Sequence, residues 1–507
     1  MTRCFLGIDN GGTVIKAALF DEFGHELAVA SHKTPVLTPR PDYQERDMED
    51  VWLCNCTCIR TVLKKSGVSP QAVAGVAVCG HGKGLYLWGQ DNSPAYPAIA
   101  STDLRARVWP KRWKDSGVHT QLYPQLCQEL IPCQQAALLA WMKEHRPDVY
   151  RNIQWVFSVK DYIRFRLTGL AFSERTDLSG SGLMDVRNDC VDPIMLQTLG
   201  IGEIADKIPP LCNSFDLCGT VTAQAARMTG LAEGTPVAGG MFDIDACAIA
   251  MDLTVPGRLC TITGTWSINE TISDDPCLGW PVAMRSRYAI PGYYLLEECS
   301  PTSAGNLEWI LNHLAGALSP SPGQSVYDLA NQRVAELAPE DCPVYFLPFL
   351  YGSNSHTYAR GSFLGLTSAC GNAHLLRAVY EGVAYAHKTH ILRLQQGALR
   401  HAPIRMAGGA ANSDVWTQIF ANVLNAPIER VQGVRELGAL GCAMAAAVAA
   451  GAYPDYIAAA RAMVRVGPPI HPNPDFVPIY QDKFETYQRI TEALTPVWDR
   501  LAAETKE

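Results

Sequence analysis

Apolar and polar positions at the start of the chain fall into short blocks separated by glycine. An apolar run at residues 5–9 leads into the turn Asn10-Gly11-Gly12, and a second apolar run follows at residues 14–20. Two β-rich runs joined by a glycine turn predict a β-hairpin, whereas a Rossmann unit would pass from its first strand into a helix.

Helical and strand-like segments alternate after this hairpin. Helical periodicity is found at residues 48–65, 134–144 and 159–168, and an apolar strand is predicted at 72–80. Strands that alternate with helices indicate an α/β architecture.

The pattern of the first hairpin returns in the middle of the chain. Residues 257–273 again form two β-rich runs around a turn, Gly264-Thr265, about 250 residues after the first. The pattern then predicts helices at 303–315, 373–397, 413–424 and 438–451, strands at 343–350 and 404–407, and a C-terminal helix. We therefore predict two similar halves, domain 1–253 and domain 254–507, that meet near residues 251–256.

Composition and charge indicate which class of protein this is and which kinds of partner it binds. The 507 residues are 48% hydrophobic and 18% charged, and 42 basic against 50 acidic residues give a net charge of −8. This balance argues against a nucleic-acid partner and leaves small molecules. The longest apolar stretch, at 438–453, is rich in Ala and Gly and too short to cross a bilayer. No signal-peptide pattern is found, so we expect a cytoplasmic protein without a membrane partner.

The cysteines show no metal-binding pattern. There are 17 of them without regular spacing, as expected of reduced thiols in a cytoplasm. Cys54, Cys56 and Cys58 lie two apart on a predicted helix, so their side chains fan around it instead of converging on zinc. We expect buried thiols there.

The first hairpin turn has the composition of a phosphate-binding loop. Gly11 and Gly12 allow the backbone to approach phosphate oxygens, Thr13 adds a hydroxyl, and Lys16 brings a positive charge. Asp9, at the end of the first strand, is placed to reach a hydrated Mg²⁺. By itself the turn suits an ordinary hairpin equally well, and the Walker pattern is absent.

Two further glycine turns complete a candidate nucleotide site. Gly264 and Thr265 echo the first turn, so two facing loops would clamp a triphosphate. The segment GGAANS at 408–413 follows a predicted strand and precedes a helix. Ser413 is its candidate N-cap, and the glycines leave room for adenine and ribose.

A carboxylate after a third glycine pair is the candidate general base. Phosphoryl transfer needs a group that takes the proton of the acceptor hydroxyl. Asp243 comes first after Gly239 and Gly240, where its side chain would face a cleft. Asp245 is the competitor, and we expect it to cap the following helix.

Two polar segments of the first half suit a sugar. The segment HGKG contains His81 and Lys83, and the segment STDLR contains Asp103 and Arg105. Such side chains on loops are typical of sites that hydrogen-bond several hydroxyl groups, although surface turns have the same composition.

Together these segments resemble the FGGY family of carbohydrate kinases over almost the whole chain. The similarity rests on GHGKG, STDLRA, KDYIRFRLTG, GGMFD, TGTW, SPTSAGNLEW, FLPFLYGS, YEGVAYAH, GGAANSDVW and ELGALGCAMAAA, which follow the N-terminal hairpin in order. Within the family, the segments ASTDLRARVWPKRW, SPTSAGNLEW and PFLYGSN are most similar to the L-xylulose kinases.

The resemblance implies two ribonuclease-H-like domains, of the actin and hexokinase type, that flank a catalytic cleft. It implies an enzyme that uses ATP and Mg²⁺ to phosphorylate a primary hydroxyl of a sugar, and a homodimer is an open expectation. It places Asp9 on the metal side, Gly12, Thr13 and Lys16 at the first phosphate loop, and Gly264 and Thr265 at the second. It places Gly408, Gly409, Ala410 and Asn412 at adenosine, Asp243 as the catalytic base that also contacts the substrate, and His81, Lys83 and Asp103 at the sugar.

Three positions depart from the family pattern. Gly12 stands where many members have Thr, His81 where Gln is common, and Lys83 where others have His or Glu. Because two of them lie in the sugar segments, the substrate stays open. L-Xylulose leads; D-xylulose, ribulose, erythritol, glycerol and a keto-sugar acid, which Lys83 would suit, are alternatives. An actin-like nucleotide switch without catalysis is the alternative from another class.

Overall fold

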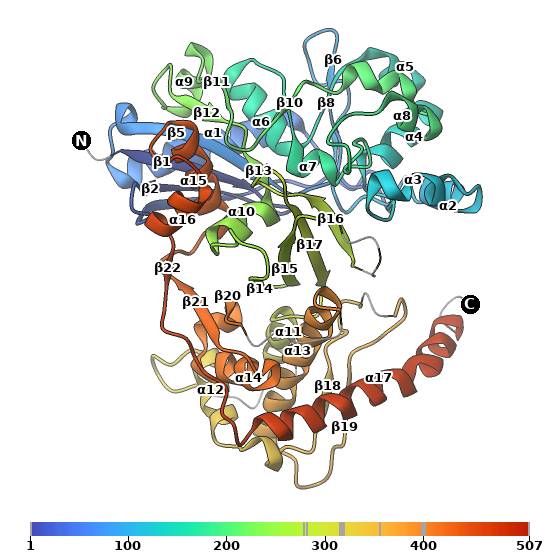
Figure 1. The fold of residues 1–507 in the computed structure, drawn as a ribbon, viewed down its shortest axis with the longest axis vertical. Coiled ribbons are helices and arrows are strands. Elements are labelled where there is room, and N and C mark those ends of the chain that lie inside the picture. Colours follow the sequence, from blue (N-terminus) through green and yellow to red (C-terminus); the bar gives the residue numbers. More distant parts are fainter. Residues whose placement is uncertain are drawn as a thin grey trace.

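Two seven-stranded sheets form the framework of the protein. The structure, a computed structural model, describes residues 3–276, 279, 282–313, 320–353, 356–396 and 402–504. Figure 1 shows the first half of the chain above the second, with the green strands of the second sheet between them.

The first sheet is built around the predicted N-terminal hairpin. Its strands are β1 (Cys4–Asn10), β2 (Val14–Asp21), β3 (Glu26–Lys33), β5 (Val73–Gly80), β11 (Leu217–Thr220), β12 (Pro236–Ala238) and β13 (Met241–Phe242). Their order is β11-β12-β5-β1-β2-β3, with β13 also paired to β5. The strands β1, β2 and β3 are antiparallel neighbours, whereas β5 runs parallel to β1.

The second sheet repeats this topology. Its strands are β14 (Leu259–Thr263), β15 (Ser267–Ser273), β16 (Met284–Arg287), β17 (Tyr294–Ser300), β20 (Ile404–Gly408), β21 (Ile428–Gln432) and β22 (Arg465–Val466). The order β22-β21-β20-β14-β15-β17 matches β11-β12-β5-β1-β2-β3 strand for strand, and the parallel and antiparallel pairs match too. The predicted α/β fold of two similar halves is thus confirmed.

Helices cover both faces of each sheet. On the outer face of the first sheet lie α1 (Met48–Ser66), α6 (Val159–Thr168) and α9 (Ala223–Thr229). Between the sheets lie α10 (Asp243–Ala250), α15 (Leu437–Ala449) and α16 (Tyr456–Met463). Against the outer face of the second lie α11 (Gly305–His313), α12 (Val326–Ala335), α13 (Asn372–Leu394), α14 (Asp414–Leu424) and α17 (Val477–Glu504).

A smaller unit with its own apolar core is attached to the first sheet. Its helices are α2 (Val108–Asp115), α3 (Val118–Leu126), α4 (Gln135–His145), α5 (Pro147–Asn152), α7 (Arg175–Ser179) and α8 (Pro193–Thr198). The remaining strands pair in twos: β4 (Glu45–Arg46) with β7 (Ala98–Ile99), β6 (Tyr86–Gly89) with β8 (Ile153–Phe157), β9 (Ser173–Glu174) with β10 (Leu211–Cys212), and β18 (Tyr345–Leu347) with β19 (Ser362–Leu364).

The predicted elements are present where the chain is described. Residues 314–315 and 397, the last positions of two predicted helices, lie outside the described residues. The division at residue 253 stays a prediction. Cys54, Cys56 and Cys58 are buried free thiols on α1, as expected. No helix among the described residues is long and apolar enough to cross a membrane.

Helix α15 joins the two halves by close backbone contact. In Figure 1 this red helix lies beside the blue strands β1 and β5 and far from α14, the helix that precedes it in sequence. A Cβ added at Gly7 of β1 would lie 1.8 Å from the carbonyl oxygen of Ala439, and one added at Gly441 would lie 2.0 Å from that of Ala246 on α10. Only glycine permits this approach, because both obstacles are backbone atoms.

Gly441→Ala is therefore expected to destabilise the protein. The added methyl group must push α15 away from α10, an overpacking that typically costs roughly 1–3 kcal/mol. Urea unfolding followed by circular dichroism measures the loss. Gly180→Ala is the control, since its φ is −85° and the new Cβ meets nothing closer than 3.4 Å. Equal stability of both variants would contradict the close packing of α15.

Candidate active site

The first hairpin turn presents its backbone to solvent. Gly12 and Thr13 are exposed between β1 and β2, and a Cβ at Gly12 would meet nothing within 4 Å. Their carbonyl groups are engaged, since Gly12 accepts from the guanidinium of Arg46 and Thr13 accepts from the amide of Thr34 at 3.2 Å. The turn is thus held on one side and exposed on the other, and its contact with phosphate stays a prediction.

Asp9 lies where the first half meets the start of α15. An added Cβ at Gly438 would lie 2.9 Å from Asp9 Oδ2 and 3.4 Å from Cys79 Sγ. The other oxygen, Oδ1, is buried and has no hydrogen-bond partner among the described residues. Loss of solvent raises the pKa of Asp9 to about 6, although the nearby charge of Lys16 lowers it. Burial therefore outweighs the attraction of Lys16, and a further cation beside Asp9 would stabilise its charged form.

Lys16 is paired across the boundary between the halves. Its Nζ lies 2.7 Å from Glu436 Oε2, at the N-terminal end of α15, and its side chain is 38% exposed. Lys16 is also the cross-strand neighbour of Asp9. Sequence reasoning missed the pairing of Lys16 with Glu436. Contact of Lys16 with a nucleotide stays a prediction, in which the nucleotide phosphates would share Lys16 with Glu436 or replace Glu436 as its partner.

Asp243 and Asp245 occupy different environments, and neither is an N-cap. Helix α10 begins at Asp243 itself after Phe242, with no side-chain cap, so the expected cap at Asp245 is wrong. Asp245 is fully buried and accepts a 3.0 Å hydrogen bond from the amide of Ala289 in the second half. The N-cap position is held by Phe242, which ends β13 after a turn at Gly240 with φ +73°.

Asp243 is half-buried in a site rich in carboxylates. Desolvation raises its pKa well above the ordinary value, and the charges of Asp9 and Asp177 add to this rise. Lys83 acts in the opposite direction. A carboxyl group with a raised pKa is a better proton acceptor near neutral pH, which is the property a general base requires.

Lys83 connects the first half to the second. It adopts the left-handed conformation, with φ +67°, in the turn after β5. Its Nζ lies 3.0 Å from Met284 Sδ on β16 and 5.7 Å from the ring centre of Phe242, the residue before Asp243. Lys83, which is predicted to contact the sugar, therefore lies near the predicted base Asp243. It contacts Phe242 of the first half and Met284 of the second.

His81 is buried next to the first hairpin. Its backbone amide donates to Asn10 at 3.0 Å, and its Nε2 lies 3.5 Å from the Tyr86 hydroxyl. Burial and the charge of Arg46 lower the pKa of His81 to about 4, so the ring is neutral at physiological pH. A neutral imidazole offers one donor and one acceptor, which suits a hydroxyl ligand.

Asp103 is occupied by the protein itself. The carboxylate is 0% exposed and accepts from the amide of Gln44 at 2.7 Å and from the guanidinium of Arg105 at 2.9 Å. These bonds hold the loop that follows β7. The structure thus gives Asp103 a role in building the loop, and its predicted direct contact with a sugar stays a prediction.

Two of the three loops predicted to bind the nucleotide converge on one cavity in the second half. A cavity of about 470 Å³ is lined by Gly264, Thr265, Gly409 and Asn412 together with residues of α11 and α12. Gly408 lies at φ +95°, where an added Cβ would clash with the Thr263 backbone. Ala410 is buried below the loop. Four predicted residues therefore line the cavity, whereas Gly408 and Ala410 are not among its lining residues, and their contact with adenosine stays a prediction.

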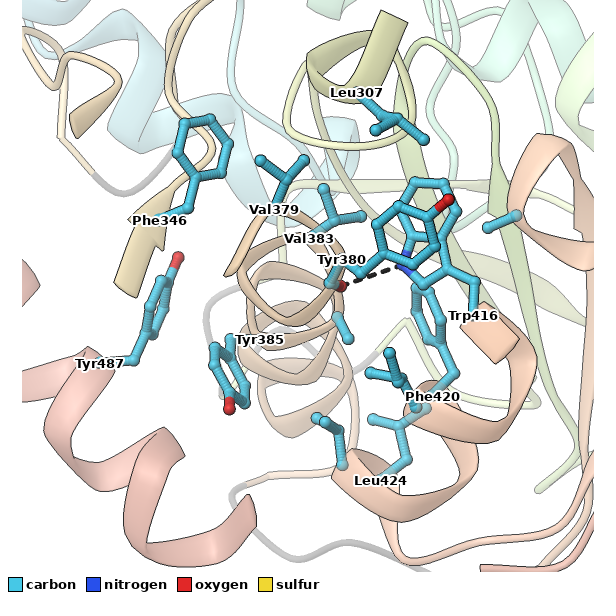
Figure 2. Packing of buried hydrophobic residues seen from close by; sticks show 14 of the residues in the cluster. Leu307, Phe346, Val379, Tyr380, Val383, Tyr385, Trp416, Phe420, Leu424 and Tyr487 are labelled. Atoms are coloured by element: carbon cyan, nitrogen blue, oxygen red, sulfur yellow. Dashed lines mark hydrogen bonds between the residues drawn. The ribbon is translucent and has the colours of Figure 1, made fainter. Parts of the chain in front are cut away.

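Aromatic side chains that sequence reasoning missed complete this cavity. Tyr380 and Trp416 stack at 4.3 Å, and the Trp416 indole donates to the Tyr380 carbonyl at 3.0 Å, as Figure 2 shows. Asn331 accepts from the hydroxyls of Tyr380 and Ser413 at 2.9 and 2.6 Å. Ser413 caps α14, as predicted, by accepting from the amide of Trp416. Flat apolar walls with fixed amide groups suit a purine base.

Comparison with known proteins identifies the family. The N-terminal domain of the FGGY family of carbohydrate kinases matches residues 4–250, and its C-terminal domain matches residues 259–450. The chain belongs to the FGGY family of carbohydrate kinases. The resemblance inferred from the motifs is confirmed, and so is the expectation of a phosphotransferase that uses ATP.

Individual relatives of this FGGY kinase carry related names. It is 37% identical over 506 residues to the L-xylulose/3-keto-L-gulonate kinase of Escherichia coli strain K12, covering 100% of both chains. It is 36% identical to a probable L-xylulose kinase of Pasteurella multocida, covering 97% of this chain and 99% of the relative. A solved xylulose kinase from Rhodospirillum rubrum is 26% identical with a TM-score of 0.87, covering 98% of this chain and 100% of the other.

The carboxylates are compatible with Mg²⁺ without forming a cage for it. Among the described residues, no group of three or more His, Cys, Asp or Glu side chains is placed to hold a metal ion. Mg²⁺ at a nucleotide is usually held by one or two carboxylates, water and the phosphates. Asp9, with an unpaired buried oxygen and a raised pKa, fits the role of such a single ligand.

Proposed function

We propose that this FGGY kinase transfers the γ-phosphoryl group of ATP to a primary hydroxyl of L-xylulose. The observation that carries the proposal is the position of Asp243, a desolvated carboxyl group beside Lys83 at the junction of the two halves. The names of the two relatives at 36–37% identity over nearly the whole chain support the choice of sugar.

In the proposed reaction, Asp243 accepts the proton of the sugar hydroxyl. The resulting oxygen forms a bond to the γ-phosphorus while the bond from that phosphorus to the bridging oxygen breaks, and ADP leaves with the electron pair. The hairpin turns at Gly12 and Gly264 would hold the phosphates through backbone amides and through the hydroxyls of Thr13 and Thr265. Asp9 would hold Mg²⁺, whose charge offsets that of the phosphates.

Adenosine would occupy the 470 Å³ cavity of the second half. The stacked pair of Tyr380 and Trp416, with Asn331 behind it, would give the base one flat wall. Separate sites for sugar and nucleotide explain why the candidate base and the adenosine loop come from different halves of the chain.

A keto-sugar acid is the second candidate substrate. The ammonium group of Lys83 lies between Phe242 and Met284, near the proposed sugar position, and would neutralise a substrate carboxylate. The Escherichia coli relative carries the name of a 3-keto-L-gulonate kinase as well. Both substrates would use the same base and the same nucleotide site.

A coupled assay of sugar-stimulated ADP release tests the substrate. The panel contains L-xylulose, D-xylulose, ribulose, erythritol, glycerol and 3-keto-L-gulonate, each with ATP and Mg²⁺. We expect the highest kcat/KM with L-xylulose, or with the keto acid if Lys83 selects for charge. Equal weak activity with every compound, or a clear preference for glycerol, would refute the proposed sugar.

Asp243→Asn is expected to reduce kcat by about 10²–10⁴-fold, the usual contribution of general-base catalysis. The amide keeps the size of the side chain but does not accept a proton. Nucleotide affinity, measured by calorimetry with ADP, is expected to stay unchanged.

Asp245→Asn is the matched control for this variant. Its amide oxygen still accepts from Ala289, and burial already favours the uncharged form of Asp245. Most activity is therefore expected to survive. Loss of turnover in Asp245→Asn together with normal turnover in Asp243→Asn would show that the other carboxylate is the base.

Lys83→Met is expected to move the acidic limb of the pH profile of kcat/KM to higher pH. Asp243 works only when unprotonated, and Lys83 lowers its pKa. Removal of the ammonium group raises that pKa, so activity is lost at a higher pH as the pH falls. Lys111→Met, at a side chain that is 76% exposed, is the control. An unchanged limb with L-xylulose would contradict the coupling of Lys83 to the base.

A further inference from the structure

A buried histidine lies directly behind the second phosphate turn. His387, on α13, is 0% exposed and far in sequence from the turn. Its Nδ1 lies 2.9 Å from Thr261 Oγ1, 3.1 Å from Ser267 Oγ and 2.9 Å from Asn269 Oδ1, and its Nε2 lies 2.9 Å from Ser303 Oγ. A single ring thus has polar neighbours on three separate segments.

The hydrogen bonds fix the tautomer of this ring. Asn269 Oδ1 only accepts, so the Nδ1 of His387 donates the hydrogen and Nε2 accepts from the Ser303 hydroxyl. Desolvation, together with the charge of His390, lowers the pKa of His387 well below the ordinary value. The ring therefore stays neutral at physiological pH, and its bonding pattern does not change there.

The partners of His387 frame the turn at Gly264 and Thr265. Thr261 belongs to β14, the strand that enters the turn, and Ser267 is the first residue of β15, the strand that leaves it. Ser303 lies two residues before Gly305, where an added Cβ would be 3.3 Å from Thr265 Cγ2. Both strands of the hairpin and the segment packed against its turn are thus tied to one side chain.

We propose that His387 is a positioning residue that sets the geometry of this turn for the phosphates of ATP. The inference rests on the proposed phosphate-binding role of Gly264 and Thr265. Phosphoryl transfer depends on placement, and a displacement of about 1 Å can cost about 10²-fold in rate. A buried ring with four polar neighbours keeps the two strands and the adjoining segment in one register.

The test compares nucleotides with and without the terminal phosphates. The leucine side chain in His387→Leu has no polar atoms, so Ser303 Oγ loses its bond to the ring and the pair of Thr261 and Asn269 loses the ring nitrogen that both contact. We expect about a 10-fold increase in the KM for ATP and a 10–100-fold decrease in kcat. The Kd of AMP should rise less than the KM for ATP, since AMP lacks the β- and γ-phosphates. The KM for L-xylulose should stay within about twofold, since the proposed sugar site lies in the first half.

Two conservative variants keep the test valid if His387→Leu folds poorly. The amide of His387→Asn reaches the position of Nδ1 and restores contact with Asn269 and Thr261, whereas that of His387→Gln reaches the position of Nε2 and restores contact with Ser303 alone. Since both strands of the hairpin bond to Nδ1, the asparagine variant should recover more ATP affinity. Wild-type ATP parameters in all three variants would overturn the inference.

Glu381→Gln is the control for a general loss of stability. Glu381 is buried on the same helix and bonds to Arg377 and Lys483, away from the hairpin. It should lower the melting temperature without changing the KM for ATP. An equal rise of that KM in Glu381→Gln would overturn the specific role of His387.

Thr265→Val separates this inference from the proposed function. If Thr265→Val leaves ATP affinity unchanged, the phosphate-binding role of the turn is wrong, and the inference falls with it. If Thr265→Val weakens ATP binding while the three His387 variants do not, only the positioning role is wrong. Weaker ATP binding in both sets, with a smaller effect on AMP binding, is the result that we expect.

Discussion

The close contact of α15 with β1 and α10 is the constraint on which the proposed site depends. Glycine at positions 7 and 441 lets backbone approach backbone where any side chain would clash, and Gly438 leaves room for the side chain of Asp9. Asp9 at the end of β1 and Asp243 at the start of α10 lie within electrostatic range of each other, because β1 and β13 both pair with β5. These two carboxylates come from segments that are far apart in sequence; the first sheet brings them together, and α15 packs against both segments.

This packing also determines the electrostatics of the site. Glu270 and Glu297 are direct cross-strand neighbours on β15 and β17, both buried, and neither oxygen of Glu270 has a hydrogen-bond partner among the described residues. Burial raises the pKa of each. Carboxylates thus outnumber the nearby positive charges of Lys16 and Lys83, an arrangement that favours a proton acceptor and a divalent cation over an additional anion. ATP would therefore bring its own counter-charge, as a magnesium complex does.

Local signals in the sequence were sufficient for the hairpins, the glycine turns and the cap of α14 at Ser413. These features depend on neighbours within a few residues, and their motifs also led to the family. The environment of a charged side chain is different, because it depends on segments that the fold brings together. The sequence offers no signal that Glu436 pairs with Lys16, that Asp245 accepts from Ala289, or that His387 bonds to both strands of a hairpin.

The central claim is that the junction of the halves raises the pKa of Asp243 enough to make it a proton acceptor. Titration of the enzyme labelled with ¹³C at aspartate carboxyl groups measures this directly, and comparison with Asp243→Asn assigns the resonance. The account predicts that the resonance missing from the variant titrates well above the ordinary aspartate value of 3.8. A resonance that titrates at or below that value in the free enzyme would contradict it.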